Sequence, residues 1–174
     1  MHDVAGRKAL FEASGLKKGR ILDIGMGDCG CMSFYLVRRG FHVVGIDRSS
    51  IAVHAARVKA ANRKCSGSFA AKRANAERLP FNRNEFDAVI AYNSFHHMDS
   101  IRKVIDEMFR VCKMRGLVVI SDLRENGKNA GEHVPDTEEL LRKIEKSVSE
   151  HAKSVRKVRA KHNMIFICRK SAMI

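Results

Sequence analysis

The stretch Ile21-Leu-Asp-Ile-Gly-Met-Gly-Asp-Cys-Gly30 joins a short apolar strand to a loop with three glycines. Glycine lets a backbone turn sharply and approach a bound molecule without a Cβ in the way. Gly25, Gly27 and Gly30 have the spacing GxGxxG, which is typical of the loop between the first strand and first helix of a dinucleotide-binding sheet. The stretch therefore predicts a ligand that contains adenosine, bound where this loop leaves the strand.

Strand and helix patterns alternate around this loop. Helix patterns cover residues 4–14, 31–39, 50–62, 100–113 and 137–151, and strand patterns cover 20–24, 42–46, 68–73, a segment from residue 85, 117–121, 154–161 and 164–169. Alternation of this kind predicts an α/β fold: a doubly wound, mostly parallel sheet of seven strands with helices on both faces. Only His162-Asn163 separates the last two strands, so we expect an antiparallel C-terminal edge hairpin that contains one reversed edge strand.

The composition indicates one globular domain that spans residues 1–174. No apolar run reaches the roughly 18 residues of a membrane helix, and the first residues lack a signal-peptide core, so a cytoplasmic protein without membrane contact is the expectation. The five cysteines are odd in number and form no CxxC pair, which predicts neither a disulfide framework nor a metal site. The sequence does not predict an oligomeric state.

The formal net charge of +14 has two interpretations. Basic residues become denser toward the end of the chain, between residues 142 and 161, and such a surface favours RNA, another nucleic acid or an acidic protein. Alternatively the charge belongs to an ordinary solvated surface, because no basic–aromatic recognition motif accompanies it. RNA or another polyanion therefore remains an alternative partner.

Two carboxylates narrow the choice of ligand. Asp47 ends the second strand about 20 residues after the glycines, where a carboxylate can accept hydrogen bonds from ribose hydroxyls. Asp23 lies within the first strand, close to the loop. A carboxylate there is unfavourable beside a pyrophosphate, but it suits a ligand with an ammonium group and a sulfonium cation.

Two further segments, Asn75-Ala-Glu-Arg-Leu-Pro-Phe81 and Phe86-Asp-Ala-Val-Ile-Ala-Tyr-Asn-Ser-Phe-His-His97, follow in order. With them the sequence resembles the class I S-adenosylmethionine-dependent methyltransferases, of the small-molecule type with LPF and HH signatures, over about residues 15–122. The resemblance implies S-adenosyl-L-methionine as the cofactor and methyl transfer as the activity. It implies cofactor-binding roles for the following residues: Asp23, Gly25, Met26, Gly27, Asp47, Arg48, Asn75, Ala76, Glu77 and Asn93.

The match departs from the family pattern at three places. Cys29 stands where many members have a third closely spaced glycine, and Asn75 stands where an aspartate is common. Met114-Arg115-Gly116 replaces the usual Pro-Gly-Gly turn. An amide at residue 75 still faces adenine with a donor or an acceptor, so the cofactor site is expected to remain.

Methyl transfer from a sulfonium needs alignment and exclusion of water more than it needs a catalytic side chain. Asn93, His96 and His97 follow the fourth strand, near the place where the resemblance puts the methyl group, and they are the candidate catalytic residues. One histidine can orient an acceptor or take a proton near neutral pH, and packing or helix capping is the alternative role for both. Tyr92 is expected to pack in the core, and packing over adenine or the substrate is its alternative role.

The acceptor is not identified by the sequence. Residues that are candidates to contact it are Arg7, Lys8 and Phe11 of the first helix, the loop at 93–99, and the loop at 124–135 with Arg124, Lys128 and His133. The basic residues favour a small anionic acceptor. An RNA methyltransferase, a non-catalytic nucleic-acid or partner-binding protein with the same fold and, third, an NAD-dependent oxidoreductase are the alternatives.

Overall fold

The structure is a computed structural model, and it describes residues 3–62, 65–123 and 137–171. The helices are α1 (Val4–Ser14), α2 (Cys31–Val37), α3 (Ser50–Ala61), the 3-10 helix η1 (Phe95–His97), α4 (Ile101–Val111) and α5 (Thr137–Ser149). The strands are β1 (Arg20–Ile24), β2 (His42–Asp47), β3 (Ser68–Arg73), β4 (Phe86–Tyr92), β5 (Cys112–Leu123), β6 (Ala152–Arg159) and β7 (Asn163–Lys170). The expected loop at 124–135 lies outside the described residues.

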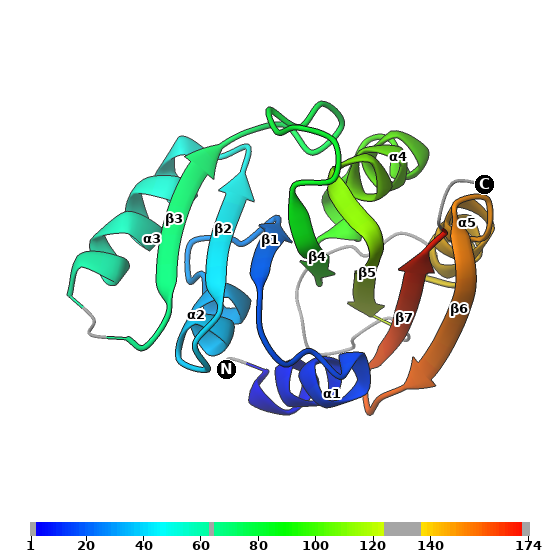
Figure 1. The fold of residues 1–174 in the computed structure, drawn as a ribbon, viewed down its shortest axis with the longest axis horizontal. Helices are drawn as coiled ribbons and strands as arrows, with labels where there is room; N and C mark the ends of the chain where they lie inside the picture. Colours follow the sequence, from blue (N-terminus) through cyan, green and yellow to red (C-terminus); the bar gives the residue numbers. More distant parts are fainter. Residues whose placement is uncertain (1–2, 63–64, 124–136, 172–174) are drawn as a thin grey trace.

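The seven strands form one sheet in the order β3-β2-β1-β4-β5-β7-β6, as Figure 1 shows. The pairs among β1 to β5 are parallel, while β7 is antiparallel to both β5 and β6. The order reverses between β1 and β4, which is the place where open α/β sheets bind ligands. The predicted α/β sheet and its C-terminal hairpin are confirmed. The reversed strand is β7, one place inside the edge, because β5 pairs with the second strand of the hairpin.

Each face of the sheet is covered by a different set of helices. Leu10 of α1 and Leu36 of α2 pack with Ile21 and Val43 of the sheet, and Phe69 links this cluster to the one beneath α3. On the opposite face α4 and α5 pack over the half of the sheet that carries β4 to β7 (Figure 1). Alternating residues of one strand enter opposite clusters, as the period of two requires.

The boundaries of the elements follow local chemistry. The Ser49 side chain accepts a hydrogen bond from the Ala52 N–H and caps α3, and Ser100 caps α4. Helix α4 ends at Val111, and β5 begins at Cys112 rather than at residue 117 because Cys112 pairs with Phe86 across a register shift. Arg115 has a φ of 63°, so this early part of β5 is irregular.

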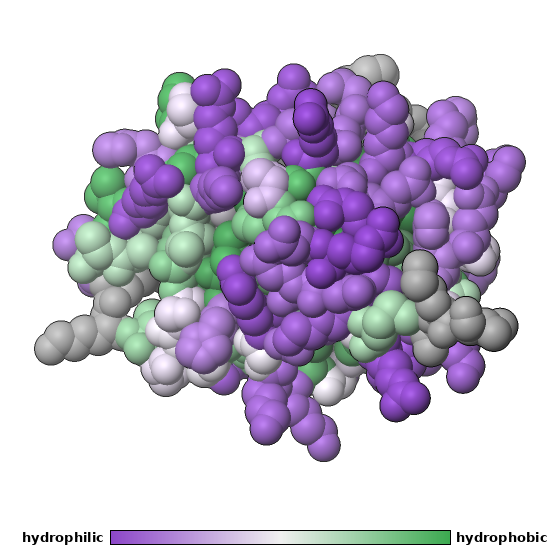
Figure 2. All heavy atoms as spheres, turned by 45° about the horizontal axis from the view of Figure 1, so that its top comes forward, coloured by the Kyte–Doolittle hydropathy of each residue, from purple (hydrophilic) through white to green (hydrophobic). Residues whose placement is uncertain are grey.

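The surface is mainly hydrophilic on the face shown in Figure 2. Apolar side chains gather at the left of that view, on the side where Figure 1 draws α3, and the exposed Ile51 and Val58 belong to this helix. The outer strand β6 instead exposes basic side chains: Lys153, Arg156, Lys157 and Arg159. Among the described residues, no helix has the length and apolar character needed to cross a bilayer.

Gly67 offers a test of how closely β2 and β3 approach at their start. A Cβ at this residue would overlap the carbonyl oxygen of Phe41 and lie 2.8 Å from that of Val37, and both are backbone atoms that cannot rotate away. We predict that Gly67→Ala lowers the free energy of unfolding by about 1–3 kcal/mol, the usual cost of overpacking. Chemical denaturation followed by circular dichroism measures this. A change below about 0.5 kcal/mol, the range of ordinary surface substitutions, would contradict the packing.

Candidate functional site

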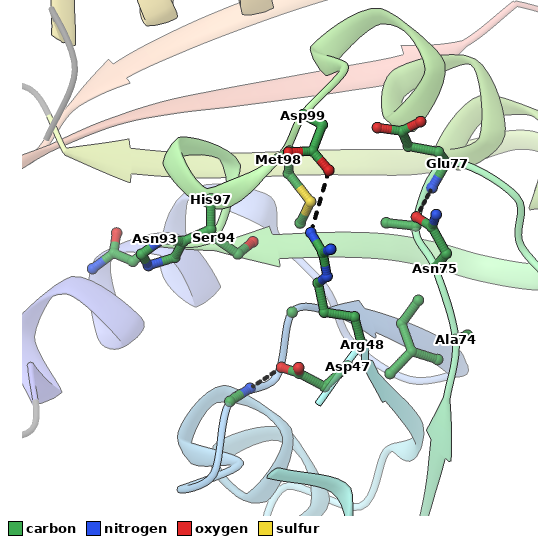
Figure 3. Close-up of a pocket in the computed structure, with 14 residues that line it drawn as sticks. Asp47, Arg48, Ala74, Asn75, Glu77, Asn93, Ser94, His97, Met98 and Asp99 are labelled. Carbon is green, nitrogen blue, oxygen red and sulfur yellow. Dashed lines mark hydrogen bonds and ion pairs between the residues drawn. The ribbon is translucent and has the colours of Figure 1, made fainter. Parts of the chain in front are cut away.

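A cavity of about 320 Å³ opens where the loops after β1, β2, β3 and β4 meet. Figure 3 shows side chains from the segments after β2, β3 and β4 arranged around it, with Asn93 and Asn75 at opposite ends of the group. The lining residues are Gly25, Gly27, Ile46, Asp47, Arg48, Ala74, Asn75, Ala76, Glu77, Asn93, Ser94, His97, Met98 and Asp99. Nine residues predicted from the sequence therefore come together here, from segments that lie up to 72 residues apart.

The glycine loop is fixed by hydrogen bonds of its main chain. The N–H groups of Gly25 and Met26 both donate to the carbonyl of Ile46, at 2.9 and 3.0 Å. Gly25 and Gly27 have φ values of 67° and 65°, in the left-handed region that favours glycine. A Cβ on Gly27 would meet no atom within 4 Å, so the absence of a side chain there leaves space for a ligand beside the loop.

Asp47 connects this loop to the end of β2. Its Oδ2 accepts a hydrogen bond from the Gly27 N–H at 3.0 Å, and its Oδ1 accepts one from the Ser49 N–H at 2.9 Å. Each carboxylate oxygen has a second lone pair that is available for a hydroxyl of a ligand. Asp47 thus combines a local structural role with the ligand role expected from the sequence.

The rim of the cavity carries further polar contacts (Figure 3). Arg48 Nη1 and Asp99 Oδ2 lie 3.3 Å apart and join two loops across the opening, with both side chains largely exposed. The Asn75 side chain accepts from the Glu77 N–H at 2.9 Å, and Glu77 in turn accepts from the Ser100 N–H at 2.9 Å. These contacts give Asn75 and Glu77 fixed positions at the lining, and they tie the loop after β3 to the start of α4.

A second cavity of about 330 Å³ shares Gly25, Gly27 and Asn93 with the first. Asp23 lines it and is buried, and its Oδ2 accepts a hydrogen bond from the Ser33 hydroxyl at 2.5 Å. Burial disfavours the charged carboxylate and raises the pKa of Asp23 to about 7, although the Ser33 hydrogen bond opposes this shift. A cationic group bound beside Asp23 would therefore stabilise the ionised form of its carboxyl group.

A cation lines the same cavity. Arg7 of α1 is 8% exposed, and its Nε is a buried donor without a hydrogen-bond partner among the described residues. The start of α1 is held at the site because Tyr92 Oη donates to Asp3 Oδ2 at 2.5 Å, while Asp3 Oδ1 accepts from the Gly6 N–H. Burial, followed by the Asp3 carboxylate, raises the pKa of Tyr92, which keeps its hydroxyl a donor.

The two neighbouring histidines have different surroundings. The side chain of His96 is 6% exposed, and its Nδ1 lies 2.8 Å from Oδ1 of the buried Asp122. Asp122 also accepts from the N–H groups of Phe95 and Leu123, so it holds the turn after β4. His97 is exposed and lines the first cavity, with its ring centroid 4.0 Å from that of His96. The geometry favours His97 as the histidine that faces a ligand and His96 as its support.

Of the other residues predicted from the sequence, some line a cavity and some do not. Met26 lines the second cavity but packs with Val53 and Ala56 beneath α3. On α1, Arg7 alone of the three nominated residues lines a cavity. Lys8 pairs with Glu12, and Phe11 packs edge-on against two aromatic rings. Arg124, Lys128 and His133 lie outside the described residues. Sequence reasoning missed four residues: Asp3, Asp122 and Asn163, which act through long-range contacts, and Ser33, which donates to Asp23.

Comparisons with known proteins agree with this geometry. A family model described as a methyltransferase domain matches residues 22–120, more than half of the chain. A ubiquinone biosynthesis O-methyltransferase of Alkalilimnicola ehrlichii is 28% identical over 160 residues, which cover 90% of this chain and 64% of the relative. An uncharacterised protein of Mycobacterium tuberculosis is 32% identical over 110 residues, 63% of this chain and 39% of the relative. The chain thus spans less than two thirds of these relatives.

The crystal structure of a putative S-adenosyl-L-methionine-dependent methyltransferase from Methanococcus maripaludis matches with a TM-score of 0.78 at 17% identity. The match covers 97% of this chain and 84% of that protein, and at this identity it establishes the fold. The match of the family model begins inside β1 and ends inside β5, so it contains the glycine loop, Asp47 and the turn after β4. The chain belongs to the methyltransferase domain family, on the class I Rossmann-like fold.

Proposed function

We propose that the chain transfers a methyl group from S-adenosyl-L-methionine to a small anionic acceptor. The first cavity would take the adenosine of the cofactor and the second its methionine end. Asp47 suits the ribose hydroxyls, and the lining near Asn75, Ala76 and Glu77 suits adenine. The two cavities meet at Gly25, Gly27 and Asn93, which allows one elongated ligand to occupy both.

The observation that carries this proposal is that the buried carboxyl group of Asp23 and the buried Nε of Arg7, which has no partner among the described residues, line the same cavity. The methionine end of the cofactor has an ammonium group, a carboxylate and a sulfonium cation. Asp23 would accept the ammonium group, and the unpaired Nε of Arg7 would donate to the carboxylate. A pyrophosphate would leave Asp23 beside two negative phosphates, which makes a nicotinamide dinucleotide a poor occupant.

The cofactor supplies an activated methyl group, so the protein's tasks are to align the acceptor and to exclude water. Asn93, at the junction of the cavities, can hydrogen-bond to a molecule in either one. His97 can take a proton from an acceptor that must lose one, and the Asp122–His96 pair holds the turn that carries it. None of these steps requires a covalent intermediate on the protein.

The choice of an anionic acceptor rests on the charge of the whole chain, which has a formal net charge of +14. The cations that line the cavities have other partners in this proposal: Arg48 pairs with Asp99, and Arg7 serves the cofactor carboxylate. The relative from Alkalilimnicola ehrlichii is named an O-methyltransferase, and oxygen nucleophiles are negatively charged once they lose a proton. We therefore expect higher turnover on anionic acceptors than on neutral compounds of similar size. Equal turnover on both would contradict this choice.

The first test of the proposal is calorimetric titration with S-adenosylmethionine, S-adenosylhomocysteine and NADH. We expect dissociation constants on the order of micromolar for both sulfur compounds, about −8 kcal/mol, and no heat from NADH. The reverse selectivity would exclude the methyltransferase assignment.

Cofactor binding should depend on pH through Asp23. Below about pH 7 the buried carboxyl is protonated in the free protein, so binding an ammonium group must first release that proton. We predict that affinity for S-adenosylhomocysteine rises up to about tenfold from pH 6 to pH 7 and levels off above about pH 8, where Asp23 is already ionised in the free protein. Titrations across this range measure the effect.

Two controls isolate this carboxyl group. Asp23→Asn should bind more weakly and lose the rise between pH 6 and pH 7. The ligand 5′-methylthioadenosine lacks the ammonium group and should bind the unaltered protein with no such rise. In the ligand-free protein Asp23 should lower stability as pH rises from about 4 to about 7, because the folded state retains a proton that the unfolded chain has released. A rise that persists in Asp23→Asn would assign it to another group.

Asp47 provides a second test. We predict that Asp47→Ala weakens binding of S-adenosylhomocysteine about 10- to 100-fold, or roughly 1.5–3 kcal/mol for the missing charged hydrogen bonds. The melting temperature of the ligand-free protein should fall by only a few degrees, because the hydrogen bonds that Asp47 accepts from Gly27 and Ser49 are not fully buried. Asp28→Ala is the matched control, since Asp28 is an exposed acid of the neighbouring glycine loop that lines neither cavity. Unchanged affinity with a large loss of stability would make Asp47 purely structural.

A further inference from the structure

The reversed direction of β7 brings its first residue to the candidate site. Asn163 begins β7 and pairs with Leu123, which ends β5. The start of β7 therefore lies at the sheet end where the parallel strands finish and where the cavities open. Asn163 is 1% exposed and lies outside the segment that the family model matches. The C-terminal hairpin thus adds a buried amide to a site built mainly from residues 23–99.

The side chain of Asn163 makes two hydrogen bonds. Its Nδ2 donates to Asn93 Oδ1 at 2.5 Å and to Ser121 Oγ at 3.0 Å. The main chain of Asn93 is held in the same place, because its N–H donates to the Ser121 carbonyl at 2.8 Å and its φ is 50°. Asn93 is therefore fixed by both its backbone and its side chain, with β5 and β7 as the supports.

The direction of the Asn163–Asn93 bond decides what Asn93 offers to a ligand. A carboxamide has an acceptor oxygen and a donor NH₂ group. The Oδ1 of Asn93 is turned toward Asn163, so its NH₂ group is the polar end that remains for a bound molecule. A donor at this junction matches an oxygen or another lone-pair atom of a bound molecule and disfavours an N–H group there.

We propose that Asn163 is a positioning residue that sets the orientation of the Asn93 amide, so that the junction of the two cavities presents a hydrogen-bond donor. This donor favours methyl acceptors that carry an oxygen or another lone-pair atom beside the reacting centre. The identity of the ligands rests on the proposed function. The orientation of the amide does not, so it is tested separately.

The test uses NMR of the ¹⁵N-asparagine-labelled protein at pH 8. The side-chain signals of Asn93 and Asn163 are assigned by their loss in Asn93→Ser and Asn163→Ser. In the unaltered protein we expect the NH₂ protons of Asn163, which make two buried hydrogen bonds, to exchange with water at least tenfold more slowly than those of Asn93. The opposite order would show that Asn93 donates, and it would overturn the proposal without any variant.

Asn163→Asp then reverses the polarity, because an ionised carboxylate only accepts and the Asn93 amide must turn its NH₂ group toward it. We expect exchange of the Asn93 NH₂ protons to slow roughly tenfold. Ser121→Ala removes the other partner of Asn163 and should leave that exchange unchanged, and Asn82→Asp makes the same chemical change at an exposed site. Unchanged exchange in Asn163→Asp would refute the positioning role. Failure of the unaltered protein to bind S-adenosylhomocysteine would refute the proposed function alone.

Discussion

The candidate site depends on one carbonyl group, that of Ile46, which receives the N–H groups of both Gly25 and Met26. This forked contact joins the end of β1 to the end of β2 at the point where both strands leave the sheet. It places the glycine loop against Asp47, and the Gly27 N–H then reaches that carboxylate. A side chain at Gly25 would meet Ser94 of the turn after β4, so the close fit of three strand ends requires a glycine.

The parts of the site that the sequence predicted are those made by neighbours along the chain or by strand ends. The glycine loop and Asp47 belong to this group, because alternation of strands and helices already places them at one edge of a parallel sheet. Local pattern also predicted the reversed strand, but not that β7 would lie inside β6. That choice depends on which hairpin strand packs beside β5, where the buried Ile165 and Ile167 fill the sheet more fully than the basic residues of β6.

Contacts between distant segments could not be predicted in the same way. The Tyr92–Asp3 bond spans 89 residues and the Asn163–Asn93 bond spans 70, and neither leaves a periodic or spacing signal. His96 and His97 are adjacent and chemically identical, so the sequence could not predict different roles for them. The buried Asp122 separates their roles by binding one of them. Arg7 was proposed for its charge, but its burial in the cavity that Asp23 also lines depends on how α1 packs on the sheet.

The outer strand β6 gives the high positive charge of the chain a meaning within the fold. Among the described residues no strand pairs with the far edge of β6, so the backbone groups of this edge could continue the sheet into a second copy of the chain. Its exposed lysines and arginines would then face their own counterparts across about 5 Å, and this repulsion opposes growth of the sheet. Salt shortens the reach of such repulsion to about 8 Å at physiological strength. Concentrated salt or a polyanion would weaken this repulsion and thereby open a route to aggregation at the edge of the sheet.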